Sequence, residues 1–233
     1  MIRVIPARQR YCTDKGWWKT CFLFSFDEYF DPGNTHFGAL RVFNDDTIAP
    51  QQGFPLHEHR DAEIVTVPIQ GAITHEDSMG NHGVVHAGEV QRMSAGTGVK
   101  HSEANHGNEP VHLYQIWFIP NEMGLTPSYE QQRFEPDAWH NSLCALAAGK
   151  GAAGAVTMHS DCTLYRGDFD QDYEIVYETA QERGIFIYVT SGSLQLPYGT
   201  LATHDQARIT GVESMQMRAL TDTSLILIDV PHQ

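Results

Sequence analysis

The chain has 233 residues, 41% hydrophobic and 19% charged, a composition that excludes a disordered protein and is typical of globular domains. It contains 15 basic and 29 acidic residues, and the formal charge of −14 argues against nucleic acid and anionic membrane surfaces as partners. The length suits one large domain or two domains of roughly 100 residues each.

The first half of the chain contains short runs rich in β-branched and aromatic residues, separated by turn residues. The expected strands are 39–43, 63–67, 72–76 and 111–119, and the expected turns are 44–46, 78–81 and 86–89. Pro120 ends the last strand because proline cannot donate to a ladder. Many short strands without a helical period predict a sandwich or a barrel.

The second half begins with a polar connector, 121–137, and continues as a second β-rich region, 143–230. Its clearest expected strands are 184–189, 193–196 and 224–230. The alanine- and glycine-rich stretch 145–156 is expected to be a surface loop, and the acidic segment 168–182 a solvent-exposed face. The chain therefore reads as two β modules in tandem.

The four cysteines, Cys12, Cys21, Cys144 and Cys162, are widely separated and form no CxxC pair. No apolar run of signal-peptide length lies near the start, and none approaches the roughly 20 residues of a membrane span. We therefore expect a cytoplasmic protein with four reduced thiols that does not enter membranes.

Histidine is unusually frequent, with 13 residues, of which nine lie between His36 and His112. His57 and His59 are two residues apart and point to one face if they lie in a strand. Glu63 has the same parity if that strand continues. About forty residues later, His101 and Glu103 show the same spacing.

Three imidazoles with one carboxylate suit a first-row transition metal, whereas calcium and magnesium prefer oxygen ligands. Parity alone does not choose between Glu63 and Glu103 as the carboxylate. Two other groups of residues are expected to be ordinary surface or core positions. They are His75, His82, His86, His106 and His112, and the aromatic residues Trp17, Trp18, Phe22, Phe24 and Phe26.

The combined pattern resembles the two motifs of the cupin superfamily: HxHxxxE, filled by His57, His59 and Glu63, and GxxHxxxN, filled by Gly98, His101 and Asn105. A narrower resemblance, to pirin and bacterial pirin-like proteins, covers roughly residues 16–134. The segments that carry it are FSFDEYFDP (24–32), FGALRVFNDD (37–46), HEDSMGN (75–81), MSAGTGVKHSE (93–103), LYQIW (113–117) and YEQ (129–131).

This resemblance implies an all-β bicupin, in which two cupin double-stranded β-helices form barrels that lie face to face. Residues 1–134 are the expected metal-binding barrel, and residues 135–233 are the expected barrel without metal. The implied ligands are His57, His59, His101 and Glu103. Glu63 matches the usual cupin carboxylate and remains the alternative ligand.

The resemblance also implies a quercetin 2,3-dioxygenase-like enzyme, which opens the central ring of a flavonol with dioxygen and releases carbon monoxide. Glu103 is the expected proton acceptor, with Glu63 as its rival. The expected cofactor is one divalent metal, iron(II) in the first place, with manganese, cobalt, nickel, copper or zinc as alternatives. We expect a monomer.

Two other functions fit the same metal site. A pirin-type regulator would use the oxidation state of the metal to switch a surface for a protein partner. Another cupin enzyme would act on a different small molecule. An assay of oxygen consumption with substrate separates an enzyme from a regulator.

Overall fold

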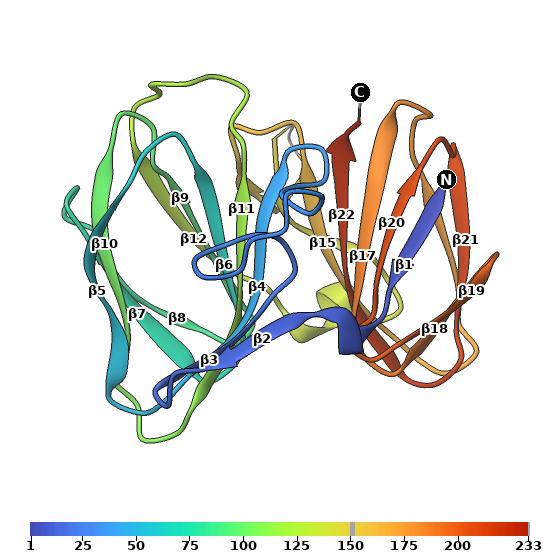
Figure 1. Cartoon of the computed structure of the whole chain (residues 1–233), viewed down its shortest axis with the longest axis horizontal. Coiled ribbons are helices and arrows are strands. Elements are labelled where there is room, and N and C mark those ends of the chain that lie inside the picture. The colour runs from blue at the N-terminus through green and yellow to red at the C-terminus, as the bar shows by residue number, and fades with distance from the viewer. Residues whose placement is uncertain (150–151, 233) are drawn as a thin grey trace.

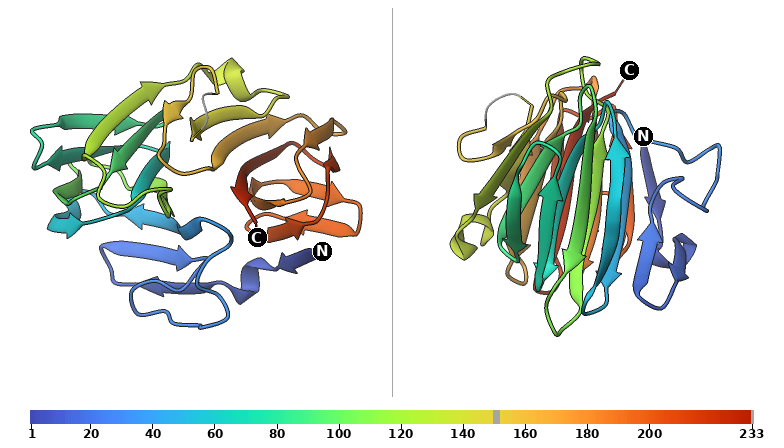
Figure 2. Two further views of the ribbon diagram at one scale, coloured as in Figure 1. Left: turned by 90° about the horizontal axis from the view of Figure 1, so that it is seen from above. Right: turned by 90° about the vertical axis from the view of Figure 1, so that its left-hand side faces the viewer.

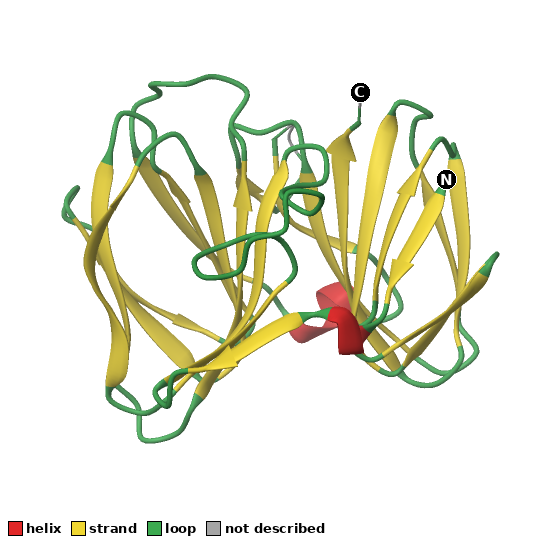
Figure 3. Ribbon diagram, in the orientation of Figure 1, coloured by secondary structure: helices red, strands yellow, loops and turns green. Residues whose placement is uncertain are grey.

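The computed structural model describes residues 1–149 and 152–232. Within this part, regular structure is almost entirely β, with two short 3-10 helices, η1 (Ala7–Gln9) and η2 (Pro136–Trp139). The strands form two groups that stand side by side (Figure 1, Figure 3). The expected all-β bicupin fold is confirmed. No helix in the described ranges is long and apolar enough to cross a membrane.

The N-terminal barrel consists of a seven-stranded sheet and a four-stranded sheet. The larger sheet has the order β12 (Ser128–Arg133), β9 (Glu89–Ser94), β6 (Glu63–Gln70), β11 (Val111–Phe118), β4 (Leu40–Ile48), β3 (Trp18–Phe22), β2 (Tyr11–Asp14). The smaller sheet has the order β5 (Gln52–His59), β10 (Val99–Asn105), β7 (Ala72–Asp77), β8 (His82–His86). Side chains of both sheets pack together inside, so the barrel closes by packing rather than by a continuous hydrogen-bonded ring.

The C-terminal barrel repeats this arrangement. Its larger sheet has the order β1 (Ile2–Ile5), β20 (Gln206–Thr210), β17 (Arg183–Ser191), β22 (Thr223–Pro231), β15 (Thr163–Phe169), β13 (Cys144–Ala148), β14 (Val156–Thr157). Its smaller sheet has the order β16 (Glu174–Glu178), β21 (Ser214–Ala219), β18 (Ser193–Leu196), β19 (Gly199–Ala202).

The two seven-stranded sheets face each other, and the largest core cluster lies between them (Figure 2). The sequence of strand β17 is almost continuously apolar because both of its faces are buried. Phe186 and Tyr188 point into the cluster between the barrels, whereas Ile185 and Ile187 point into the C-terminal barrel. A strand buried on both faces loses the usual alternation of apolar and polar residues.

Three expectations about local structure are wrong. Residues 44–46 are not a turn but the middle of β4, where Asn44 and Asp46 are buried. The connector 121–137 contains β12, which pairs with β9. The stretch 145–156 begins inside β13, where residues 146–148 are buried, and its positions 150–151 lie outside the described residues. These strands contain many polar or small residues, so a pattern of hydrophobic residues does not indicate them.

The N-terminal segment belongs to both barrels. Strand β1 pairs with β20 of the C-terminal barrel, and the chain then crosses through η1 to β2 at the edge of the N-terminal barrel. The crossing ties the two barrels together through backbone hydrogen bonds.

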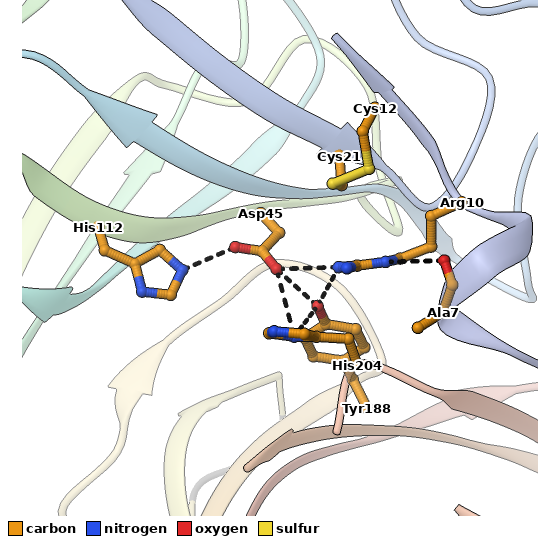
Figure 4. Close-up of a disulfide and its surroundings, with 8 residues drawn as sticks. All are labelled: Ala7, Arg10, Cys12, Cys21, Asp45, His112, Tyr188 and His204. Carbon is orange, nitrogen blue, oxygen red and sulfur yellow. Dashed lines mark hydrogen bonds and ion pairs between the residues drawn. A yellow bond between two sulfur atoms is a disulfide. The ribbon is translucent and has the colours of Figure 1, made fainter. Parts of the chain in front are cut away.

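A disulfide joins Cys12 to Cys21 (Figure 4), so the expectation of four reduced thiols is wrong. Cys144 and Cys162 are the free cysteines of the described chain. Cys12 and Cys21 are nine residues apart, but the β2–β3 hairpin places them opposite each other in register. Opposite residues in an antiparallel pair have close Cβ atoms, which the sequence spacing does not reveal.

Candidate metal centre

Three histidines converge from two neighbouring strands of the small N-terminal sheet. His57 and His59 lie on β5, and His101 on β10 is opposite His57 in the antiparallel register. The three imidazoles offer ring nitrogens that lie within 4.8 Å of one another. The period of two in a strand places His57 and His59 on one face, and the pairing with β10 adds His101.

The hydrogen bonds around these rings leave nitrogen lone pairs for an ion. His57 Nδ1 lies 2.7 Å from the carbonyl oxygen of Pro55, to which it can donate, so its Nε2 remains a potential ligand. His101 Nε2 is buried and has no hydrogen-bond partner among the described residues. A buried polar atom without a partner is costly unless something else binds it. The donor set therefore fits a first-row transition metal.

The environment keeps two of these imidazoles neutral. Burial lowers the pKa of His59 to about 4, with a further contribution from His101 and His57. Burial likewise lowers the pKa of His101 to about 3, and His57 and His75 contribute as neighbours. A neutral imidazole is the form that coordinates a metal, so these rings need not lose a proton before binding.

Glu103 lies on the same strand as His101, after a bulge that shifts the β10–β5 register between them. Its carboxylate accepts hydrogen bonds from Gln115 Nε2 (2.8 Å), Thr66 Oγ1 (3.1 Å) and Gln91 Nε2 (3.2 Å). It groups with His101 and His75 within 4.8 Å, but not with the cluster that contains His57. A role of Glu103 as fourth ligand therefore stays a prediction.

A protein side chain already lies within hydrogen-bond distance of two members of the group formed by His75, His101 and Glu103. The Gln91 amide nitrogen lies 3.3 Å from His75 Nδ1 and 3.2 Å from the Glu103 carboxylate. We therefore interpret this buried group as a hydrogen-bond network behind the three-histidine cluster and not as a second ion site.

His75 has a more specific place than an ordinary core position. Its Nε2 lies 3.1 Å from the Asp77 carboxylate, and its Nδ1 lies 3.4 Å from His101 Nδ1. If His75 donates to Asp77 through Nε2, the one lone pair on its Nδ1 can accept either the Gln91 amide N–H or the His101 N–H. In the second case the lone pair of His101 stays on Nε2. Such partners behind a ligand set its tautomer and orientation. The HxD spacing at 75–77 is the sequence signal that could have indicated this role.

Glu63 lies apart from the imidazoles. Strand β5 ends at His59 and Glu63 begins β6 in the other sheet, so the parity argument does not extend across the break. The buried Glu63 carboxylate accepts hydrogen bonds from Ser94 Oγ (2.9 Å) and from the backbone N–H of His159 (3.0 Å). The described contacts give it a role between the two barrels.

A cavity of about 430 Å³ opens onto the histidine cluster. Its wall contains Trp17, Trp18, Phe26, Phe54 and Trp117, together with the polar residues Lys15, Asp27, Asn44, Asp46, Glu103 and Gln115. Trp17, Trp18 and Phe26 thus line a cavity in addition to packing, whereas Phe22 and Phe24 are fully buried. Its size and its aromatic lining are typical of a small-molecule site.

Asp46 is a cavity residue that sequence reasoning did not select, because Asn-Asp-Asp is typical of a turn. The residue is 3% exposed, and its carboxylate accepts a hydrogen bond from Trp18 Nε1 at 2.9 Å. Burial raises its pKa to about 7, against the opposing effect of hydrogen bonds. A buried carboxylate that titrates near neutral pH is typical of functional sites.

Comparison with known proteins relates both halves of the chain to families. Residues 5–118 match the family model described as Pirin, and residues 145–230 match the quercetinase C-terminal cupin domain. An Escherichia coli K12 protein named quercetin 2,3-dioxygenase is 40% identical over 99% of both chains. A pirin-like protein of Caulobacter vibrioides is 37% identical over 93% of this chain and 94% of that one.

The fold of the chain also matches that of solved structures. The crystal structure of the bacterial pirin YhhW from Escherichia coli in complex with nickel(II) matches with a TM-score of 0.95. It is 38% identical, and the match covers 100% of both chains.

Proposed function

The chain belongs to the pirin family, and on that premise we propose that it is a metal-dependent dioxygenase that opens the central ring of flavonols such as quercetin and releases carbon monoxide. The observation that carries this proposal is the convergence of three imidazoles at the wall of an aromatic cavity of about 430 Å³. The relatives named quercetin 2,3-dioxygenase support it.

We assign the metal to His57, His59 and His101, with Glu103 as the fourth ligand. Iron(II) is our first choice, and nickel, manganese, cobalt, copper and zinc are alternatives, nickel because the related YhhW is described with it. When bound, such a metal supplies Lewis-acid stabilisation of a substrate oxyanion and a binding position for dioxygen. Neutral imidazole ligands do not offset the positive charge of the ion. Glu103 and the ionised substrate hydroxyl would therefore balance it.

The aromatic residues of the cavity suit a planar substrate. Trp17 and Trp18 meet Phe54 edge to face, at ring-centroid distances of 5.2 and 5.1 Å. Trp117 meets His59 in the same way at 4.7 Å. These rings provide apolar contact to a flavonol and exclude water from the space next to the histidines.

Two carboxylates can take up the proton of the substrate hydroxyl. Glu103 is held by three side-chain donors, which suits a fixed ligand. Asp46 accepts a hydrogen bond from Trp18, and its pKa of about 7 lets it accept or release a proton near neutral pH. We assign proton uptake to Asp46 and ligation to Glu103. Glu63 lies between the barrels and takes no part.

The experiment is oxygen uptake with quercetin by iron-loaded and metal-free protein, with carbon monoxide measured at the same time. We expect metal-dependent uptake with carbon monoxide release. His101→Ala should lose metal and turnover but keep its circular dichroism spectrum, because the barrel core does not depend on one ligand. His82→Ala is the matched control, since His82 is exposed and pairs with Glu76.

Absence of uptake with iron and with each of the five other metals would contradict the proposal. In that case the regulatory function, or a cupin reaction on another small molecule, would explain the metal site. Normal metal content in His101→Ala would show that the ion binds elsewhere.

A further inference from the structure

The Cys12–Cys21 disulfide lies in the wall of a second pocket, of about 700 Å³. This pocket also contains Arg10 and Asp45, together with one histidine from each barrel, His112 and His204 (Figure 4). Cys12 is exposed and Cys21 is partly exposed. The sulfur pair is therefore accessible from an open pocket and not sealed in a core.

The disulfide fastens a strand whose residues are all exposed or only partly buried. Among the described strands, β2 lies at the edge of its sheet, pairs only with β3, and contains no buried residue. At its start, Arg10 Nη1 donates to Asp45 Oδ2 (3.1 Å) on one barrel and to the Tyr188 hydroxyl (2.6 Å) on the other. The side-chain contacts of β2 itself lie at the surface: the Tyr11 ring stacks on Tyr29 at 4.9 Å, and Asp14 pairs with Lys19 at 3.0 Å. If the disulfide opens, these contacts, Arg10 and the pairing with β3 remain to hold the strand.

The hairpin that the disulfide closes also forms one wall of the metal cavity. Lys15, in the turn, and Trp17 and Trp18 next to it all line that cavity. Lys15 Nζ pairs with Asp27 at 2.9 Å and lies 5.0 Å from the Trp18 ring centre. The disulfide thus lies at one end of a short hairpin, and the edge of the cavity that opens onto the histidine cluster lies at the other end.

We propose that Cys12 and Cys21 form a redox-active pair that small dithiols reduce in the folded protein through the pocket between the barrels, and that reduction loosens the hairpin at the edge of the metal cavity. The pocket is large enough for such a reductant. The proposed ligand class is a small dithiol. Its binding site, the pocket beside the disulfide, is separate from the histidine cluster.

The chemical step balances as ordinary thiol–disulfide exchange. One thiolate of the dithiol attacks the exposed Cys12 sulfur, and Cys21 leaves as a thiolate that takes a proton from water. The second thiol of the reductant then attacks the mixed disulfide and releases Cys12. The protein gains two electrons and two protons as two thiols, and the dithiol is oxidised to its own disulfide.

The first test measures reduction without unfolding. Native protein is incubated with dithiothreitol, alkylated with N-ethylmaleimide and digested for peptide mass spectrometry. We expect Cys12 and Cys21 to be labelled only after dithiothreitol. Cys162 is the internal control, because it is buried and burial raises the pKa of its thiol to about 12, so it should stay unlabelled until denaturant is added.

Labelling of Cys12 and Cys21 only in denaturant would overturn the proposal, because the pair would then be a closed structural cross-link. Full labelling of both without any reductant would overturn it as well, because no disulfide would exist to be reduced.

The second test measures how fast the backbone amides of residues 11–18 exchange hydrogen with solvent in the oxidised and in the reduced wild-type protein. Removing a cross-link that closes a short loop should accelerate exchange there roughly tenfold. The double variant Cys12→Ser/Cys21→Ser should exchange at the fast rate in both conditions, and the control Cys144→Ser should follow the wild type. Equal exchange in the two redox states would refute the coupling to the hairpin. Neither readout uses flavonol turnover, so the result is independent of the proposed reaction.

Discussion

At the scale of single residues, Asp45 and Asp46 are neighbours in β4 whose side chains point to opposite faces of the sheet. Asp45 lies between the barrels, where burial acts to raise its pKa but hydrogen bonds from His112 and Tyr188 and the nearby Arg10 bring it below the usual value. Asp46 has no cationic partner among the described contacts, and burial raises its pKa to about 7. Two adjacent aspartates thus have opposite shifts because their surroundings differ.

Asp46 predicts a dependence of stability on pH in the metal-free protein. The pKa of its carboxyl is about 7 in the folded chain against an ordinary value of 3.8, so between these values the folded state binds more protons than the unfolded state. The free energy of unfolding contributed by Asp46 should therefore fall as pH rises through this window, by at most roughly 4 kcal/mol.

Asp46→Asn removes this titration. Denaturant unfolding of wild type and variant at pH 5 and pH 8 measures it, and the variant should gain stability relative to the wild type at the higher pH. An equal stability difference at both pH values would contradict the raised pKa.

At the scale of elements, the sheet order β5-β10-β7 places the three clustered histidines and His75 on adjacent strands. The spacing of two in a strand predicts that His57 and His59 share a face, and they do. It does not predict that β7 pairs with β10, where His75 lies opposite Glu103 and Asp77 lies opposite His101. Pairing between strands distant in sequence depends on how the whole barrel closes, so a pattern within one strand cannot reveal it.

The Asp77–His75–His101 chain predicts an effect on metal binding without loss of a ligand. His75→Ala should lower metal affinity by about 10- to 100-fold, because His101 loses the partner that fixes its tautomer. Competitive titration with a metal chelator measures the affinity, and circular dichroism verifies the fold. The exposed His82→Ala serves as control. An affinity equal to that of the wild type would show that His75 only packs.

At the scale of the whole molecule, the C-terminal barrel contributes structure to the N-terminal barrel. The buried Glu63 accepts the backbone N–H of His159, and the two seven-stranded sheets share one core cluster. The HxHxxxE motif places Glu63 next to the histidines in the sequence, but the chain passes into the opposite sheet before reaching it.

Glu63→Gln should therefore retain metal and lose stability. We expect a metal content equal to that of the wild type and a loss of about 1 to 3 kcal/mol in the free energy of unfolding, because the buried carboxyl group that accepts from Ser94 and from the His159 N–H is replaced by an amide. Metal analysis and denaturant unfolding on the same samples measure both quantities. Loss of metal with an unchanged fold would reverse the choice between Glu63 and Glu103.

The sequence by itself determined the features that depend on local spacing and composition. Short runs of β-branched and apolar residues indicated seven of the 22 described strands, and the period of two predicted the shared face of His57 and His59. The motifs also indicated the family, which the comparisons support.

Only the tertiary structure decided which distant groups meet. Strand register brought Cys12 to Cys21, β7 brought His75 behind His101, and burial between sheets gave Asp46 its raised pKa. The physical reason is that hydrogen-bond partners, dielectric surroundings and cross-strand neighbours are set by elements that lie far apart in sequence.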